Sequence, residues 1–130
     1  MAQVSMTKKR PKHLDLMKIR LPLPGIVSIL HRVSGAALFL IGIPFLLTVM
    51  NCSLANQDGF DRWKASIGNP LVKVILIGFL WAYLHHFFAG LRYLALDLHK
   101  GIDLPTARLT SKLVLIASIA LTLILGAWLW

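Results

Sequence analysis

The chain has 130 residues, of which 57% are hydrophobic and only 15% are charged, and its mean hydropathy is +0.72. This composition is typical of a membrane protein and excludes an ordinary soluble domain of this length. The formal net charge is +9, but the basic residues cluster outside the apolar segments. A nucleic-acid-binding protein is therefore excluded, because no soluble scaffold remains to present a basic patch. The single cysteine, Cys52, excludes an intrachain disulfide.

Residues 1–25 are predicted to form a basic cytoplasmic arm. No short apolar segment followed by a small-residue cleavage site indicates a signal peptide, although the composition leaves a mitochondrial presequence open. The segment Leu21-Pro-Leu-Pro-Gly25 is expected to prevent a helix, because proline and glycine disfavour its continuation. The arm's basic residues are Lys8, Lys9, Arg10, Lys12, Lys18 and Arg20.

The first transmembrane helix is predicted over about residues 26–50. Its uncharged part, Val33 to Met50, is 18 residues long, which is just enough to cross the hydrocarbon core. Pro44 is expected to kink this helix. Small residues recur every seventh position, at Ser28, Gly35 and Gly42, and form a stripe that another helix could approach closely.

The rest of the chain predicts two further spans. A polar connection follows the first span, with a short interfacial helix expected around Phe60 to Ile67. Asn69 and Pro70 form the start signal of the second span, residues 70–96. A polar loop, residues 98–112, is expected before the third span, residues 111–130, whose closing tryptophans fit an interfacial aromatic belt. The sequence therefore predicts an all-α membrane domain, residues 26–130, with three transmembrane helices.

The distribution of Lys and Arg predicts the orientation of these helices. Eleven lie in the N-terminal arm through Arg32 and in the segment from Arg92 to Lys112, and three lie in the first connection. Because basic residues are retained on the cytoplasmic side, the N-terminus is expected in the cytoplasm and the C-terminus outside. A bacterial inner membrane is the expected location, with the mitochondrial inner membrane as the alternative.

The second span contains the first candidate site. His85 and His86 lie within a run from Val74 to Leu91 that has no Asp, Glu, Lys or Arg. Ionisable side chains at bilayer depth are costly and indicate function. Gly90 lies one turn from His86 on the same face, and Asp97 about three turns, roughly 16 Å, away. The residues alone leave two interpretations open, namely an axial ligand to haem iron and a histidine hydrogen-bonded between helices.

Two polar clusters near the cytoplasmic surface complete the candidates. Ser28, His31 and Arg32 could form a polar pocket for an anionic or carbonyl-bearing group, or could simply cap the helix and reach lipid phosphates. His31 is also the only histidine outside the second span that lies at membrane depth, so a second haem ligand would come from it or from a partner subunit. Arg92 and Asp97 could contact haem propionates or conduct protons, or could simply close the helix with charge.

Two sequence patterns resemble a known family. Ser28-Ile-Leu-His31-Arg32-Val-Ser-Gly35 resembles the S-x-x-H-R-x-[ST]-G signature of the cytochrome b556 subunit of succinate dehydrogenase. His86-x-x-x-Gly90-Leu-Arg92-Tyr-x-x-x-Asp97 resembles the second signature of that family, except that Tyr93 replaces a frequent histidine. The order, the spacing and the three-span layout match across nearly the whole chain.

This resemblance implies half of a heterodimeric helix bundle around a b-type haem. It implies His86 as one axial ligand, with the second ligand from the partner anchor subunit, and His31 and Arg32 near the haem propionates. It further implies that Ser28 and Arg32 bind ubiquinone and that Ile29 lines the same site. The expected partners are a second small membrane anchor, an iron–sulfur subunit and a flavoprotein of succinate:quinone oxidoreductase, which is respiratory complex II in the tricarboxylic acid cycle. The chain by itself is expected to catalyse nothing.

Two alternatives remain open from sequence. A fumarate reductase anchor has the same architecture but serves the reverse reaction. A cofactor-free membrane assembly scaffold would need neither haem nor quinone.

Overall fold

In the computed structural model, which describes residues 19–130, every regular element is a helix. The elements in order are α1 (Leu23–Ala37), the π-helical segment η1 (Leu38–Gly42), α2 (Ile43–Ala55), α3 (Gln57–Ile67), α4 (Pro70–Asp97) and α5 (Leu104–Leu129). Three helical stretches are long and apolar enough to cross a membrane: Leu23–Ala55, Pro70–Asp97 and Leu104–Leu129. The predicted all-α fold with three membrane-spanning helices is confirmed.

The first helix begins earlier than expected. Leu21 to Gly25 was predicted to prevent a helix, and this prediction was wrong, because α1 begins at Leu23 with Pro22 as its N-cap residue. Pro24 occupies the first turn, where a backbone N–H has no partner within the helix and the fixed φ of proline is already helical. The basic arm lies mostly in residues 1–18, outside the described part of the chain.

Pro44 perturbs the first span through a widened turn of helix. Proline cannot donate to the carbonyl four residues before it, and its ring crowds that carbonyl. The chain responds one turn earlier with η1, in which the Ile43 N–H bonds to the carbonyl of Leu38, five residues back. Helix therefore continues through Pro44 for 33 residues in all, from Leu23 to Ala55.

The two connections differ in how well they were predicted. The expected interfacial helix is α3, which starts at Gln57 because the Asn56 side chain accepts from the Gly59 N–H at 2.8 Å. Asn69 caps α4 as predicted, accepting from the Leu71 N–H at 2.9 Å. The prediction of a loop over residues 98–112 was wrong, because Asp103 caps α5 and the helix begins at Leu104. Pro105 lies in its first turn, as Pro24 does in α1.

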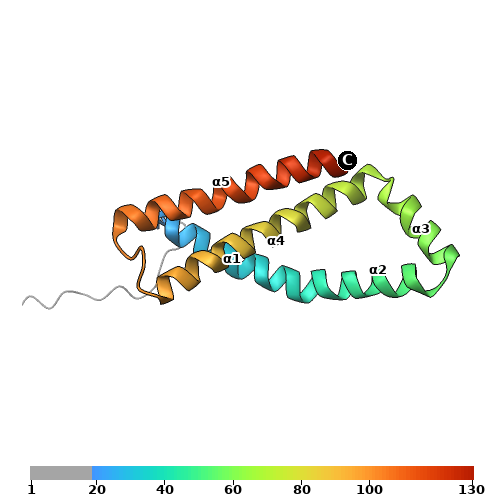
Figure 1. Cartoon of the computed structure of the whole chain (residues 1–130), viewed down its shortest axis with the longest axis horizontal. Helices are drawn as coiled ribbons and strands as arrows, with labels where there is room; N and C mark the ends of the chain where they lie inside the picture. Colours follow the sequence, from blue (N-terminus) through green and yellow to red (C-terminus); the bar gives the residue numbers. More distant parts are fainter. Residues whose placement is uncertain (1–18) are drawn as a thin grey trace, which may run out of the picture.

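α1, α4 and α5 pack side by side, with the starts of α1 and α5 and the end of α4 gathered at the left of Figure 1, whereas α2 diverges from α4. α1 runs antiparallel to α4, because His31 meets Gly90 and Gly35 meets His86. The predicted stripe of small residues faces α4 at two of its three positions, since Gly35 lies against His86 and Gly42 against Phe79.

Small residues on α5 face the second span. The buried positions of α5 are Ser111, Val114, Ser118, Thr122 and Gly126, which recur every three or four residues. Gly126 receives the Ile77 side chain, to which a methyl group on that glycine would lie 3.5 Å away. Because lipid is as apolar as the helices, close van der Waals contact through small residues is what holds such helices together. The shared core contains Val27, Ala89 and Val114, one from each span.

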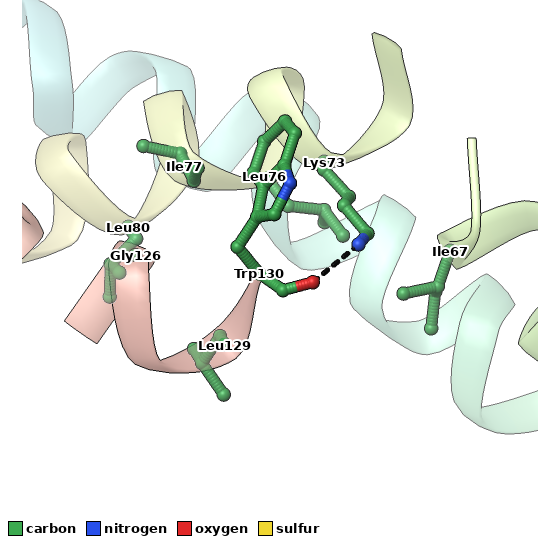
Figure 2. A pocket seen from close by; sticks show the side chains of 8 residues that line it. All are labelled: Ile67, Lys73, Leu76, Ile77, Leu80, Gly126, Leu129 and Trp130. Carbon is green, nitrogen blue, oxygen red and sulfur yellow. Dashed lines mark hydrogen bonds between the residues drawn. The ribbon is translucent and has the colours of Figure 1, made fainter. Parts of the chain in front are cut away.

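A cavity of about 270 Å³ lies at the far end of the bundle, between the start of α4 and the end of α5 (Figure 2). Lys73 donates to the Trp130 carbonyl at 2.6 Å, and its ammonium group lies 5.0 Å from the centre of the Trp130 ring. The Lys73 ammonium therefore has both a hydrogen-bond acceptor and a cation–π partner in Trp130.

Candidate functional site

The two histidines of α4 point to different neighbours, because residues adjacent in a helix are rotated by about 100°. His86 is half-buried and faces α1. His85 is fully buried and its ring stacks on Trp81, with the ring centres 5.4 Å apart. Within residues 19–130, neither ring nitrogen of His85 has a hydrogen-bond partner. The two imidazoles therefore occupy separate environments.

His86 is held by the backbone of α1. Its Nδ1 lies 3.0 Å from the His31 carbonyl oxygen, which is an acceptor only, so Nδ1 carries the proton and donates. The Ser34 hydroxyl donates to the same carbonyl at 3.0 Å and lies 3.4 Å from Nδ1. In a neutral imidazole, a protonated Nδ1 leaves Nε2 with a free lone pair. This is the usual way in which a ligand histidine is oriented toward iron.

Gly35 makes room for this ring. A β-carbon at Gly35 would lie 2.7 Å from Cε1 of His86 and 3.1 Å from Nδ1. Neither distance is compatible with an unmoved ring. The sequence pattern assigned Gly35 only to helix packing, so its contact with the candidate ligand is a finding of the structure.

Gly90 lies one turn from His86 on the same face of α4, as helical geometry predicts, and it also faces His31 of α1. The group nearest to it is Nε2 of His31, 3.8 Å from the position of an added β-carbon. This is an ordinary van der Waals distance. A methyl group at Gly90 would therefore contact the His31 ring without displacing it.

His31 is stacked on His86. The ring centres lie 4.2 Å apart and the planes differ by 9°, and Tyr93 approaches His31 from another direction at 5.1 Å. An imidazole binds a metal through a lone pair in the plane of its ring. Two rings stacked face to face direct these lone pairs sideways, so in this arrangement they do not converge on one ion. Among residues 19–130, no group of three or more His, Cys, Asp or Glu side chains could hold a metal ion.

The residues expected to bind quinone lie at the start of α1. Ser28 is half-buried, whereas Ile29 and Arg32 are exposed on this chain. Since Ser28 and Arg32 are four residues apart, they lie on neighbouring turns of one helix face. The hydroxyl and the guanidinium therefore lie along one side of α1, and on this chain the guanidinium is uncovered.

The structure separates Arg92 from Asp97. Arg92 is 9% exposed and its Nε donates to the Thr110 hydroxyl of α5 at 3.1 Å, while Asp97 is exposed near the end of α4. A separation of five residues places these side chains on different faces of the helix. Arg92 therefore shares the α5-facing side with His85, and Thr110 is a partner that sequence reasoning missed.

Comparison with known proteins identifies the family. Residues 6–125 match the family model described as succinate dehydrogenase/fumarate reductase transmembrane subunit. This chain belongs to that family. It is 34% identical to the succinate dehydrogenase cytochrome b556 subunit of Coxiella burnetii over 126 residues, which cover 96% of this chain and all of the relative. The subunit of Paracoccus denitrificans is 30% identical, with 88% of each chain covered, and that of Rickettsia felis is 27% identical, with 90% of each covered.

The resemblance inferred from the two signatures is thereby confirmed. Together with the three long apolar helices, membership of this family makes the chain a multi-pass membrane protein.

Proposed function

We propose that this chain is the membrane anchor of a succinate dehydrogenase complex that binds one b-type haem and ubiquinone. The observation that carries the proposal is the hydrogen bond from Nδ1 of His86 to the His31 carbonyl, which leaves Nε2 as a free ligand atom within an apolar helix. The curated relatives are named cytochrome b556 subunits of succinate dehydrogenase, which supports this function over that of a fumarate reductase anchor.

The residues present fit a histidine that would hold a haem iron. His86 would supply the ligand atom, Gly35 gives its ring space, and the His31 carbonyl with Ser34 fixes its orientation. The stacked geometry of His31 favours a second ligand from the partner anchor subunit. We assign His31 and Arg32 to the haem propionates. When bound, the haem would supply a one-electron carrier whose potential depends on its ligands.

Quinone chemistry is assigned to the start of α1. Electrons from the iron–sulfur subunit build negative charge on a quinone carbonyl oxygen, and a hydroxyl donor with a fixed cation in a water-poor site stabilises that charge. Ser28 would donate from its hydroxyl, Arg32 would supply the cation and Ile29 would line the site. Because Ile29 and Arg32 are exposed on this chain, the partner subunits would complete the pocket.

The proposed orientation places this end of the bundle in the cytoplasm. The counts of Lys and Arg support it, and they place Asp97, an exposed carboxylate, where protons from the cytoplasm could be collected. Arg92 faces α5 and His86 faces α1, so we do not assign Arg92 to the haem on the His86 face.

The deciding experiment compares the two adjacent histidines. The complex is purified with His86→Ala or His85→Ala, and its reduced-minus-oxidised spectrum is recorded together with the yield of all subunits. We expect the b-type band to vanish in His86→Ala and to remain in His85→Ala, because only His86 is held by a hydrogen bond that orients its free Nε2, whereas neither nitrogen of the buried His85 has a partner within residues 19–130. A haem band that survives His86→Ala would refute the assignment. A cofactor-free scaffold would give no band in either protein or in the wild type.

A further inference from the structure

Arg92 is a buried cation without an anion. It is 9% exposed, and its partners among residues 19–130 are the Thr110 hydroxyl and the face of Tyr93, 5.7 Å from the guanidinium carbon. Within the described part of the chain, no carboxylate approaches it. At the other end of the bundle, the Lys73 ammonium donates to a backbone carbonyl (Figure 2). The Arg92 guanidinium is less well satisfied, because four of its five N–H groups remain after the one donated to Thr110. A mostly buried charge without a counter-ion is costly, and the free N–H groups of Arg92 are not fully enclosed by the protein, so they can be reached by a group from outside the chain.

A cavity of about 180 Å³ lies beside this guanidinium, between the end of α4 and the start of α5. A second cation, Lys100, lines it, and no Asp or Glu does. The remaining lining is mostly apolar and includes Leu96, Leu113 and Val114. A site with two cations at its polar end and alkyl groups around it is complementary to an anion attached to a hydrocarbon.

The turn after α4 brings Lys100 back over the helix end. The Lys100 N–H bonds to the Ala95 carbonyl at 3.0 Å, and Gly101 follows with a φ of +76°, a conformation that glycine adopts without strain. This reversal folds the lysine toward the cavity instead of letting it extend with the helix axis. Lys100 is nevertheless exposed, so its ammonium can meet a group that enters from the membrane surface.

We infer that this cavity binds the phosphate of an anionic phospholipid of the cytoplasmic leaflet. Arg92 lies five residues before the end of α4, about 7.5 Å along the helix axis, which is a depth where lipid phosphates are within reach of basic side chains. Basic pockets between transmembrane helices on the cytoplasmic side recognise such headgroups. The cavity is too small for a whole lipid, so the acyl chains lie along the exposed apolar surface outside it.

The test uses the purified complex, stripped of lipid with detergent and titrated with phosphatidylglycerol in native mass spectrometry. Lys100→Gln removes the exposed cation of the site. Lys112→Gln is the matched control, because Lys112 is also exposed and lies at the same end of the bundle but does not line the cavity. We expect Lys100→Gln to weaken the tightest lipid binding by about tenfold, the loss of one charge-assisted hydrogen bond, and Lys112→Gln to leave it within about twofold.

Two further probes identify the ligand. Diacylglycerol has the hydrocarbon without the phosphate and should bind wild type and Lys100→Gln equally. Inorganic phosphate has the anion without the hydrocarbon and should not displace the lipid at equal concentration. Equal lipid binding by Lys100→Gln and the wild type, or an equal loss in Lys112→Gln, would overturn the inference. Displacement by inorganic phosphate would make this a free-anion site and overturn the lipid assignment. The haem spectrum, recorded on the same samples, reports on the proposed function separately.

Discussion

Replacing Gly35 with alanine should disturb the candidate haem ligand directly. The added methyl would lie 2.7 Å from Cε1 of His86, whereas ordinary contacts begin near 3.4 Å, so the ring must retreat by about 0.7 Å. The ring cannot retreat freely, because its other neighbours are the His31 ring, with centres 4.2 Å apart, and the His31 carbonyl at 3.0 Å. Moving away from Gly35 therefore strains the hydrogen bond that orients Nε2.

The magnitude follows from the usual cost of overpacking. One inserted methyl in a packed site costs about 1–3 kcal/mol, which corresponds to a reduction in haem affinity of about fivefold to 150-fold. The assay measures haem bound per complex during a titration with added haem, together with the midpoint potential of the b-type band. We expect a weaker affinity and a shifted potential, because the orientation of an axial histidine tunes the iron.

A matched glycine separates this effect from helix propensity. Gly78→Ala adds the same methyl to α4, and its β-carbon would have no neighbour within 4 Å. Alanine favours helix over glycine, so this control should bind haem as the wild type does. Wild-type affinity and potential in Gly35→Ala would refute the reasoning, since a ring that moves without consequence is not held as the structure indicates.

Three further outcomes are expected. Arg32→Ala should slow quinone reduction by roughly 100-fold while complex yield stays near normal, because one donor to a developing oxyanion is worth about that factor; simple failure to assemble would remove the support for a quinone pocket. Asp97→Asn should lower turnover and change its pH profile if this exposed carboxylate collects protons, and unchanged turnover across pH would count against that role. Asp103 accepts from the Thr106 hydroxyl at 2.6 Å and from its N–H at 3.0 Å, which lowers the pKa of Asp103. Its contribution to stability is therefore present at neutral pH and is lost as the pH falls below about 4 through the lowered pKa, so thermal unfolding of Asp103→Asn should depend less on pH in that range.

Proline positions show where sequence rules misled the interpretation of local structure. The segment with Pro22 and Pro24 was expected to prevent a helix and the segment with Pro105 to be a loop, yet Pro24 and Pro105 each lie in a first turn, where proline is favoured. Whether such a proline ends one segment or begins the next depends on which residue becomes the cap. Asp103 caps α5 through its side chain, which accepts from the Thr106 N–H, so Pro105 lies in the first turn of the helix that follows.

The number of spans, their approximate positions and the two polar signatures were determined by sequence alone, because hydropathy and helical periodicity act within one segment. Helical periodicity also separated His85 from His86. Three features of the site are evident only in the tertiary structure. It shows which nitrogen of His86 is free, that Gly35 makes room for the His86 ring, and that Arg92 pairs with Thr110. Each depends on the register between two helices. That register is set by close packing of small residues far apart in the chain, which no local pattern encodes.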